Sequence, residues 1–286
     1  MKKYLANRRL IIIAALLLAN LFVWSVLAGT HHGLLTVNFL DVGQGDAIFI
    51  EAPNGNQVLI DGGPGRSVLS GLGQVMSFYD RSIDLVIATH PDSDHIAGLP
   101  AVFDNYQVAG FMAPALICQT AICETLEIKV ASEPAPKVIA ARGEKIILGD
   151  GVELEILSPA GSALGNDTNS ASIVAKLTYG QTSFLFTGDA PQAIERYLLS
   201  EFGQNLDIDV LKVGHHGSDT SSAPEFLAAT SPAVAVISVG KDNRYGHPKA
   251  SVVDSLVKIG AKIFRTDEQG TVIFKTDGVK IILPKP

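Results

Sequence analysis

One short segment constrains this chain more than any other. Residues 88–98 read ATHPDSDHIAG and place two histidines and two aspartates between His90 and His95. The preceding run, IDLVIAT from Ile83 to Thr89, is apolar and β-branched, which is typical of a buried strand. A solvated loop is the ordinary explanation for mixed polar residues, but this cluster lies where a core strand reaches the surface. The pattern therefore favours a functional site.

Similar apolar runs recur along the chain and predict strands over residues 34–41, 46–52, 57–63, 83–89, 152–157, 171–180, 182–189, 209–216, 233–240 and 270–276. Asn54-Gly55 and Asp277-Gly278 are hairpin signals, and ASEPAPK (131–137) indicates a surface loop between strands. Helical patterns cover residues 67–80, 95–103, 190–201, 222–229 and 249–259. This mixture predicts two packed sheets with helices outside.

Polar residues follow several of these strands directly. They are Asp61, His90, Asp189, the pair His215-His216, and His247 after a glycine turn. Strand ends along one rim of a rigid scaffold are where binding sites are usually built. We expect these residues to meet in one site.

The N-terminus differs in kind from the rest. Four basic residues precede an uncharged apolar run from Leu10 to Ala28, which is long enough to span a bilayer as one helix. We expect residues 1–29 to form a retained anchor, residues 30–33 a linker, and residues 34–286 a hydrolase domain outside the cytoplasm. The alternative is a signal peptide cleaved after Ala28, which would release a secreted domain.

Charge limits the possible partners of the exported part. No acidic residue precedes Asp41, so beyond the basic tail the chain carries 18 Lys and Arg against 29 Asp and Glu. A broad basic groove for nucleic acid is therefore not expected. The only two cysteines, Cys118 and Cys123, are spaced for a small disulfide loop in an oxidising compartment, or are ordinary buried residues.

The histidines indicate a metal site. Of seven, His31 and His32 lie in the expected linker and receive no role, while the other five follow apolar strands. Imidazole and carboxylate side chains can complete two adjacent metal sites with one bridging carboxylate. Such a centre activates water for hydrolysis and requires no serine or cysteine nucleophile.

These residues occur in an order that resembles the metallo-β-lactamase fold superfamily. More specifically, VNFLDVGQGDAIFIEAPNGNQVLIDGG, THPDSDHIAGL, NSASIVAKL, FTGD, KVGHHGS and YGHP are similar to the metallo-hydrolase domain of ComEC DNA-uptake channel proteins, from about Leu35 to Leu283. The resemblance implies an α/β fold, a four-layer αββα sandwich, with two divalent ions, manganese or zinc.

The resemblance also implies roles for individual residues. One ion would be held by His90, Asp92 and His215 or His216, and the other by Asp94, His95 and His247, with Asp189 bridging. Asp94 and the His215-His216 pair are the catalytic candidates, and the histidine that is not a ligand would protonate a leaving group or steady a phosphoryl oxygen. Asp46 and Asp61 would orient ligands, and Ser170, Ser172, Ser218 and Tyr245 could contact substrate, although turn or capping roles are commoner for such residues.

Asp92 stands where the superfamily usually has histidine, and Asp is the expected residue in the ComEC-like group. A hard oxygen donor shifts the preference towards manganese or a mixed site and towards phosphoesters. We therefore expect a phosphodiesterase or nuclease acting on DNA. The alternatives are an esterase of teichoic acid or phosphocholine-type esters, and a non-catalytic metal-stabilised partner of a DNA-uptake channel. With one hydrophobic span, the chain would need a partner chain for any channel role.

Overall fold

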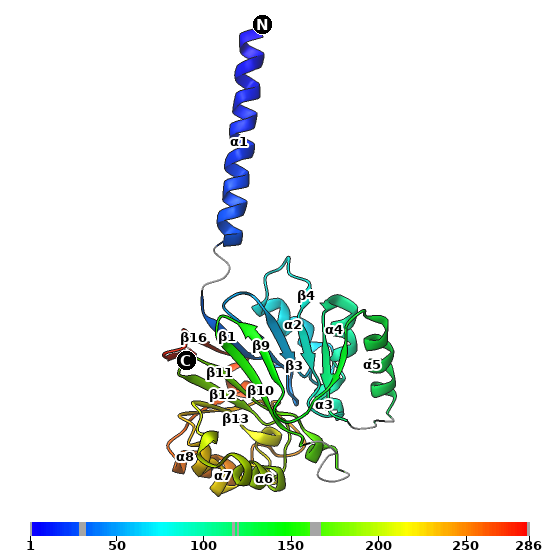
Figure 1. Cartoon of the computed structure of the whole chain (residues 1–286), viewed down its shortest axis with the longest axis vertical. Helices are drawn as coiled ribbons and strands as arrows, with labels where there is room; N and C mark the ends of the chain where they lie inside the picture. The colour runs from blue at the N-terminus through cyan, green and yellow to red at the C-terminus, as the bar shows by residue number, and fades with distance from the viewer. Residues whose placement is uncertain (1, 29–32, 116–117, 119, 161–166, 285–286) are drawn as a thin grey trace.

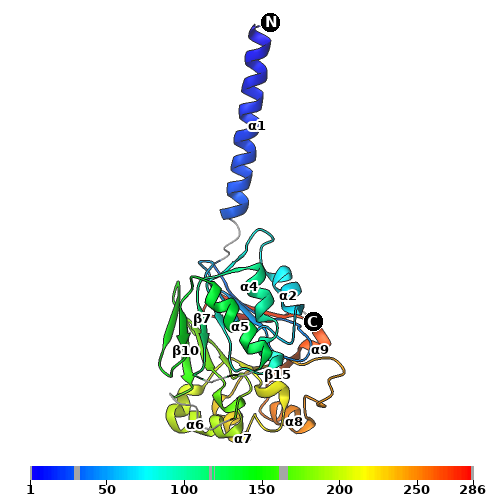
Figure 2. The same cartoon turned by 90° about the vertical axis from the view of Figure 1, so that its right-hand side faces the viewer.

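The computed structural model describes residues 2–28, 33–115, 118, 120–160 and 167–284. It consists of an N-terminal helix, α1 (Lys2–Ala28), that projects from an α/β domain (Figures 1 and 2). The expected linker residues 30–32, with His31 and His32, lie outside the described residues. Within α1, Asn7–Trp24 is long and apolar enough to cross a membrane, and none of it is buried against the domain. A signal sequence has the same properties.

Two mixed sheets form the domain. The first has the strand order β17 (Ile281–Ile282), β16 (Val272–Thr276), β1 (Leu35–Phe39), β2 (Ile48–Glu51), β3 (Gln57–Ile60), β5 (Leu85–Ile87), β7 (Phe111–Ala113) and β8 (Lys137–Ile139). The second has the order β15 (Lys262–Arg265), β14 (Val234–Ile237), β13 (Val210–Lys212), β12 (Thr182–Phe186), β11 (Val174–Tyr179), β10 (Val152–Ser158) and β9 (Lys145–Gly149). A small parallel pair joins β4 (Ser82–Ile83) to β6 (Gln107–Val108).

The helices lie on the outer faces of the sheets (Figures 1 and 2). The first sheet is covered by α2 (Ser67–Val75), α3 (Ser93–Ile96), α4 (Leu99–Asn105) and α5 (Ala121–Ser132), and the second by α6 (Gln192–Phe202), α7 (Pro224–Thr230) and α8 (Ala250–Lys258). Short elements complete the chain: α9 (Thr266–Gln269), η1 (Asn169–Ala171), η2 (Gly203–Leu206) and η3 (Gly214–Gly217). The expected αββα sandwich is confirmed.

The side-chain pattern explains the four layers. Between the sheets lies a core that includes the phenylalanines Phe39, Phe184, Phe186 and Phe274. β16 alternates buried and exposed residues because its other face meets solvent, whereas β3 is buried throughout because α2 to α5 cover that sheet. Each sheet is therefore fixed by apolar contacts, and its strand ends are free to carry polar groups.

Some boundaries differ from the sequence prediction. The helix expected over 67–80 ends at Val75, and the helix expected over 95–103 is two helices, α3 and α4, that meet at a bend. The segment 131–137 does not join two strands, because α5 ends at Ser132 and β8 begins at Lys137. The pattern of α5 was missed because it lacks a continuous apolar stripe.

Candidate metal centre

The histidine and carboxylate side chains meet on one side of the domain, where strands of both sheets end. Asp61 follows β3 and His90 follows β5, and these strands are parallel. Asp189 follows β12, and the His215-His216 pair follows β13, which is parallel to β12. Loops at the carboxyl ends of parallel strands open towards the same side, which is where α/β proteins usually bind ligands. The two sheets thus supply opposite halves of one centre.

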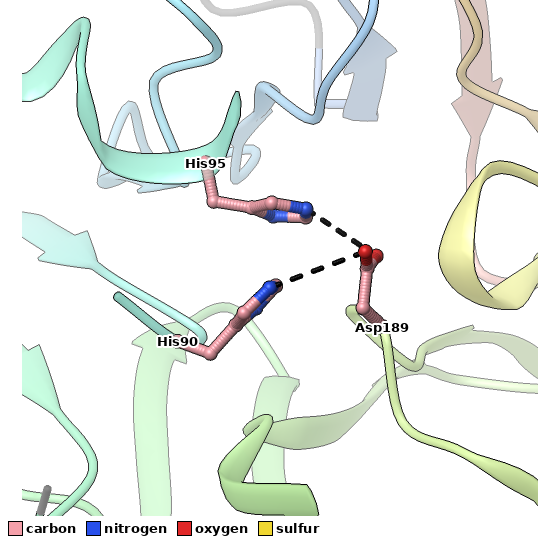
Figure 3. Close-up of side chains that lie close together, drawn as sticks. All are labelled: His90, His95 and Asp189. Atoms are coloured by element: carbon pink, nitrogen blue, oxygen red, sulfur yellow. Dashed lines mark ion pairs between the residues drawn. The ribbon is translucent and has the colours of Figure 1, made fainter. Parts of the chain in front are cut away.

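Four imidazoles surround the carboxylate of Asp189. Nε2 of His95 lies 3.3 Å from its Oδ1, and the Nε2 atoms of His215 and His216 each lie 3.6 Å from its Oδ2. Nε2 of His90 lies 4.0 Å from Oδ2. Figure 3 shows the His90 and His95 rings pointing at this carboxylate from the loop and the short helix that follow β5. Asp189 is therefore the central acid of the centre.

The first pair of rings, His90 and His95, is oriented by contacts at the Nδ1 atoms. Asp61 Oδ2 lies 2.7 Å from His95 Nδ1 and also accepts a hydrogen bond from the Thr89 hydroxyl. Since that hydroxyl donates to Asp61, it can accept from His90 Nδ1, 3.0 Å away. Both Nδ1 atoms therefore face an acceptor, and in the neutral ring Nε2 keeps its lone pair for the centre.

The second pair of rings, His215 and His216, is oriented at Nδ1 in the same way. His216 Nδ1 lies 2.9 Å from the carbonyl oxygen of Ser238. His215 Nδ1 lies 2.9 Å from the hydroxyl of Thr220, which itself donates to Ser218. All four rings thus present Nε2 to Asp189, and the buried Nε2 atoms of His90, His95 and His216 have no hydrogen-bond partner among the residues that the structure describes. Such orphaned nitrogens beside a carboxylate fit a bound cation.

The backbone of the GHHG turn aims the second pair. His215 and His216 have φ angles of 49° and 55°, in the left-handed region that residues with a Cβ rarely adopt. Such a conformation costs about 1–3 kcal/mol per residue and is concentrated at functional sites. Two successive strained histidines indicate that ring placement outweighs backbone preference here.

Glycine permits the close approach of the loop that precedes β2. Gly45 has a φ of 140°, and a Cβ built on it would lie 2.1 Å from the carbonyl oxygen of Asp94. The next residue, Asp46, donates its backbone N–H to that same oxygen at 3.3 Å. Replacing Gly45 would push this loop away and displace Asp46 from beneath the centre.

The carboxylate of Asp94 lies beside the ring of His216. Asp94 Oδ2 lies 3.4 Å from His216 Nε2, and donor atoms of Asp94, His95 and His216 lie within 4.8 Å of one another. Burial alone would raise the pKa of Asp94, but hydrogen bonding to His216 and the charge of His95 lower it to about 2. Asp94 is thus a carboxylate at neutral pH.

The carboxylates favour positive charge on the buried rings. Burial opposes a charged His95, yet Asp189 and Asp61 raise the pKa of its imidazole well above the usual range. By contrast, burial and the neighbouring His95 lower the pKa of His90 well below the usual range. Opposite shifts in adjacent buried groups are typical of functional sites.

The ligand sets that the resemblance implied stay a prediction. His216, not His247, is the ring beside Asp94 and His95. His247 lies at the rim, where its ring centroid is 5.8 Å from those of His215 and Tyr245. Asp92 is partly exposed, with Oδ2 3.8 Å from His90 Nε2.

The serine candidates have partners within the chain. The Ser170 hydroxyl donates to Asp167, Ser172 accepts from the backbone N–H of Asp189, and Ser218 accepts from Thr220. These are turn and positioning contacts, as is usual for serine at such places. Tyr245 is exposed at the rim.

Sequence reasoning missed Lys212. This lysine is fully buried at the end of β13, where its ammonium contacts Asp46, donates to the carbonyl oxygen of Gly188 at 3.0 Å and lies 3.8 Å from Asp189 Oδ1. Burial disfavours its charge, but Asp46 and Asp189 outweigh that cost and raise the pKa of the ammonium. A lysine inside the apolar run DVLKVG was the available signal.

An αββα sandwich with a buried histidine–aspartate centre at the shared edge of its sheets defines a class of metal-binding proteins. The chain belongs to the metallo-beta-lactamase superfamily, whose family model matches residues 40–241. The metallo-beta-lactamase fold protein YhfI from Bacillus subtilis has the same fold, with a TM-score of 0.58 at 12% identity, covering 85% of this chain and all of that one.

Within the superfamily the chain is related to ComEC-like competence proteins. It is 32% identical over 260 residues to ComE operon protein 3 of Bacillus subtilis (strain 168), which covers 84% of this chain and 33% of that protein. It is 32% identical over 241 residues to Competence protein ComA of Neisseria gonorrhoeae, which covers 83% of this chain and 32% of that protein. The chain thus spans about a third of the length of these relatives.

Proposed function

We propose that this chain is a dinuclear metal-dependent phosphodiesterase that acts on DNA outside the cytoplasm. The observation that carries the proposal is the convergence of four imidazole Nε2 atoms on Asp189. Donors of this kind fit divalent manganese or zinc, and the oxygen donor Asp92 beside His90 favours manganese.

The geometry supports a revised set of ligands. Asp94, His95 and His216 would hold one ion, and His90 and Asp92 the other, with Asp189 shared between them. When bound, the two ions would lower the pKa of a water molecule and neutralise charge that develops on a phosphoryl group.

Side chains around the metal ligands position the rings, balance the charge and contact the substrate. Asp61 and Thr89 hold the first ring pair, and Lys212 balances the carboxylates from beneath. His215 is the half-buried ring of the pair, held through Thr220, and in its imidazolium form it is placed to give its Nε2 proton to a leaving oxygen or to donate that N–H to a phosphoryl oxygen. His247 stands beside it at the rim and is a second candidate for contact with substrate.

The rim supports an anionic substrate with stacking groups. Arg244 lies over the Tyr245 ring at 5.1 Å, and that ring stacks on His247. Lys249 donates to the Tyr245 carbonyl oxygen. An exposed aromatic ring flanked by two cations suits a nucleobase and its phosphates, on a domain that is otherwise acidic. Relatedness to competence proteins favours DNA.

The acidic charge of the domain supports a second candidate. With 18 basic against 29 acidic residues beyond the tail, a long polyanion is repelled outside the rim. A small phosphodiester meets less of this repulsion, and a phosphocholine ester, such as those on teichoic acids, carries a positive choline group that offsets the charge of its own phosphate. We propose further that α1 is a retained anchor, which supports action at the membrane.

One experiment tests the activity and the substrate together. The full chain in detergent is assayed for bound metal and for hydrolysis of a generic phosphodiester, single- and double-stranded DNA, and choline-phosphate esters, with added manganese or zinc. Asp189→Ala is the inactive variant, and Asp254→Ala, at an exposed position on α8, is the matched control.

We expect manganese-dependent cleavage of DNA that Asp189→Ala abolishes and Asp254→Ala retains. Hydrolysis of small esters without DNA cleavage would remove the nuclease proposal and leave the phosphodiesterase. A wild-type chain that binds no metal and matches Asp189→Ala on every ester would refute both.

A further inference from the structure

Two adjacent aromatic side chains are exposed at the tip of a tight turn. Phe78 is 87% exposed and Tyr79 is 47% exposed, and their ring centroids are 5.3 Å apart. They are the central residues of a turn closed by a hydrogen bond from Asp80 N to the carbonyl oxygen of Ser77 at 2.9 Å. Single exposed apolar residues are ordinary, but a paired aromatic tip is a candidate contact surface.

The turn, here called the aromatic turn (Ser77–Asp80), is held firmly against the domain. Asp80 accepts hydrogen bonds from the side chain of Gln57 at 2.6 Å and from the backbone and hydroxyl of Ser82 at 3.1 and 3.0 Å. A fixed turn loses little conformational freedom when its tip is covered, which favours binding.

These hydrogen bonds place the aromatic turn at one end of the strands of the first sheet. Gln57 is the first residue of β3, and β3 runs in the same direction as β1, because both are antiparallel to β2. The end of the sheet where β3 begins is thus also the end where β1 begins, at Leu35, just after the chain arrives from α1. The aromatic turn and the entry from α1 share one end of the domain.

The figures agree with this topology. In both views the loop between α2 and β4 projects from the end of the domain that faces α1 (Figures 1 and 2). The metal centre lies at the other end of the same strands, because Asp61 and His90 follow the last residues of β3 and β5.

We propose that the aromatic turn rests in the lipid–water interface as a second membrane contact beside α1. This inference rests on the proposed anchoring by α1. Tyrosine is favoured in this interface because its apolar ring and its polar hydroxyl are both accommodated there, and the wholly apolar phenylalanine ring gains from insertion beside it. Asp80 and Asp84 lie at the same end of the domain and outnumber the exposed Arg81 between them, so the contact depends on aromatic insertion and not on attraction to anionic lipid.

The contact fixes the orientation of the domain. Held at two points, the domain stands with the starts of β1, β3 and β5 towards the bilayer and with Asp189 directed away from it. The substrate then approaches from the solvent side of the domain.

Fluorescence quenching in vesicles tests this contact. Trp24 is the only tryptophan, so Trp24→Phe gives a silent background in the full chain. Into it, Phe78→Trp or Tyr79→Trp places a reporter at the turn, and Val257→Trp places one at a comparably exposed apolar site (62%) on α8, at the opposite end. Each protein is reconstituted in neutral phosphatidylcholine vesicles with and without brominated acyl chains.

We expect bromine to quench the reporters at positions 78 and 79 more strongly than the one at 257, with emission shifted to shorter wavelength, and to the same degree when anionic lipid is added. If Trp24 of the native chain is quenched while the turn reporters match Val257→Trp, the aromatic turn is not a lipid contact although α1 is an anchor. If Trp24 itself is unquenched, the anchoring and this inference both fail, whereas hydrolysis measured on the same samples remains an independent readout.

Discussion

His95 Nδ1 lies 2.7 Å from Asp61 Oδ2, and this contact turns His95 Nε2 towards Asp189. Asp61 is fully buried, and its other oxygen accepts the backbone N–H of Thr89 at 2.7 Å. We predict that Asp61→Asn weakens metal binding about 10–100-fold, because an amide offers one acceptor where three hydrogen bonds converge. Competition with a fluorescent chelator measures the affinity.

The control for Asp61→Asn is Asp150→Asn. Asp150 is exposed and has a φ of 52°, which asparagine tolerates well. Equal metal affinity in the two variants would show that Asp61 does not orient the centre.

Asp92 should determine which metal is preferred. Its carboxylate lies 3.8 Å from His90 Nε2 and is 40% exposed, so a larger ring can be accommodated. We predict that Asp92→His raises the preference for zinc over manganese by about tenfold or more, because a borderline nitrogen donor replaces a hard oxygen. Metal content after equilibration with both ions reports the change. An unaltered ratio of bound zinc to bound manganese would show that Asp92 does not determine which metal is preferred.

Lys212 should matter for folding. Its ammonium is fully buried against Asp46, and removing one member of a buried ion pair costs about 3–5 kcal/mol. We predict that Lys212→Met lowers the free energy of unfolding by this amount in urea, and that Asp46→Asn in the same chain restores part of it. Strictly additive effects of the two substitutions would mean that the pair is not coupled.

Glu195 gives the domain a pH-dependent stability apart from the metal centre. Burial raises the pKa of its carboxyl from 4.5 to about 7, although the backbone N–H groups of Ala223 and Ser222 lower it in part. Between these pH values the folded chain holds a proton that the unfolded chain releases, so stability falls as pH rises. The shift corresponds to roughly 3 kcal/mol.

The measurement is urea unfolding between pH 5 and pH 8. We predict that the wild type loses more stability across this range than Glu195→Gln, which cannot titrate there. Glu127→Gln, at an exposed position on α5 and not among the charges that shift the Glu195 pKa, should keep the wild-type slope. Identical slopes in all three proteins would contradict the assignment to Glu195, since histidine titrations are common to them.

The fold was predictable from sequence because its strands are apolar runs punctuated by turn residues. Asn54-Gly55 and Asp277-Gly278 do lie between paired strands, and the order of polar residues along the chain indicated one shared edge. Short strands such as β7 (Phe111–Ala113) escaped prediction because their pairing, and not their own sequence, stabilises them.

The sequence predicted which residue types form the site, and their division into two ligand sets stays a prediction. A sequence shows that His216 and His247 both follow strands, but only packing of the GHHG turn decides which ring reaches Asp94. Lys212 was missed because a single lysine in an apolar run has no periodicity that marks it as buried. Such long-range pairings depend on tertiary structure.

The disulfide between Cys118 and Cys123 has a consequence for inorganic chemistry. These are the only cysteines of the chain, so it has no thiolate to offer. Thiophilic ions such as Cu(I) prefer soft sulfur anions and find none here. The domain should therefore tolerate thiol-directed alkylating reagents, and the choice among cations at the metal centre is left to nitrogen and oxygen donors.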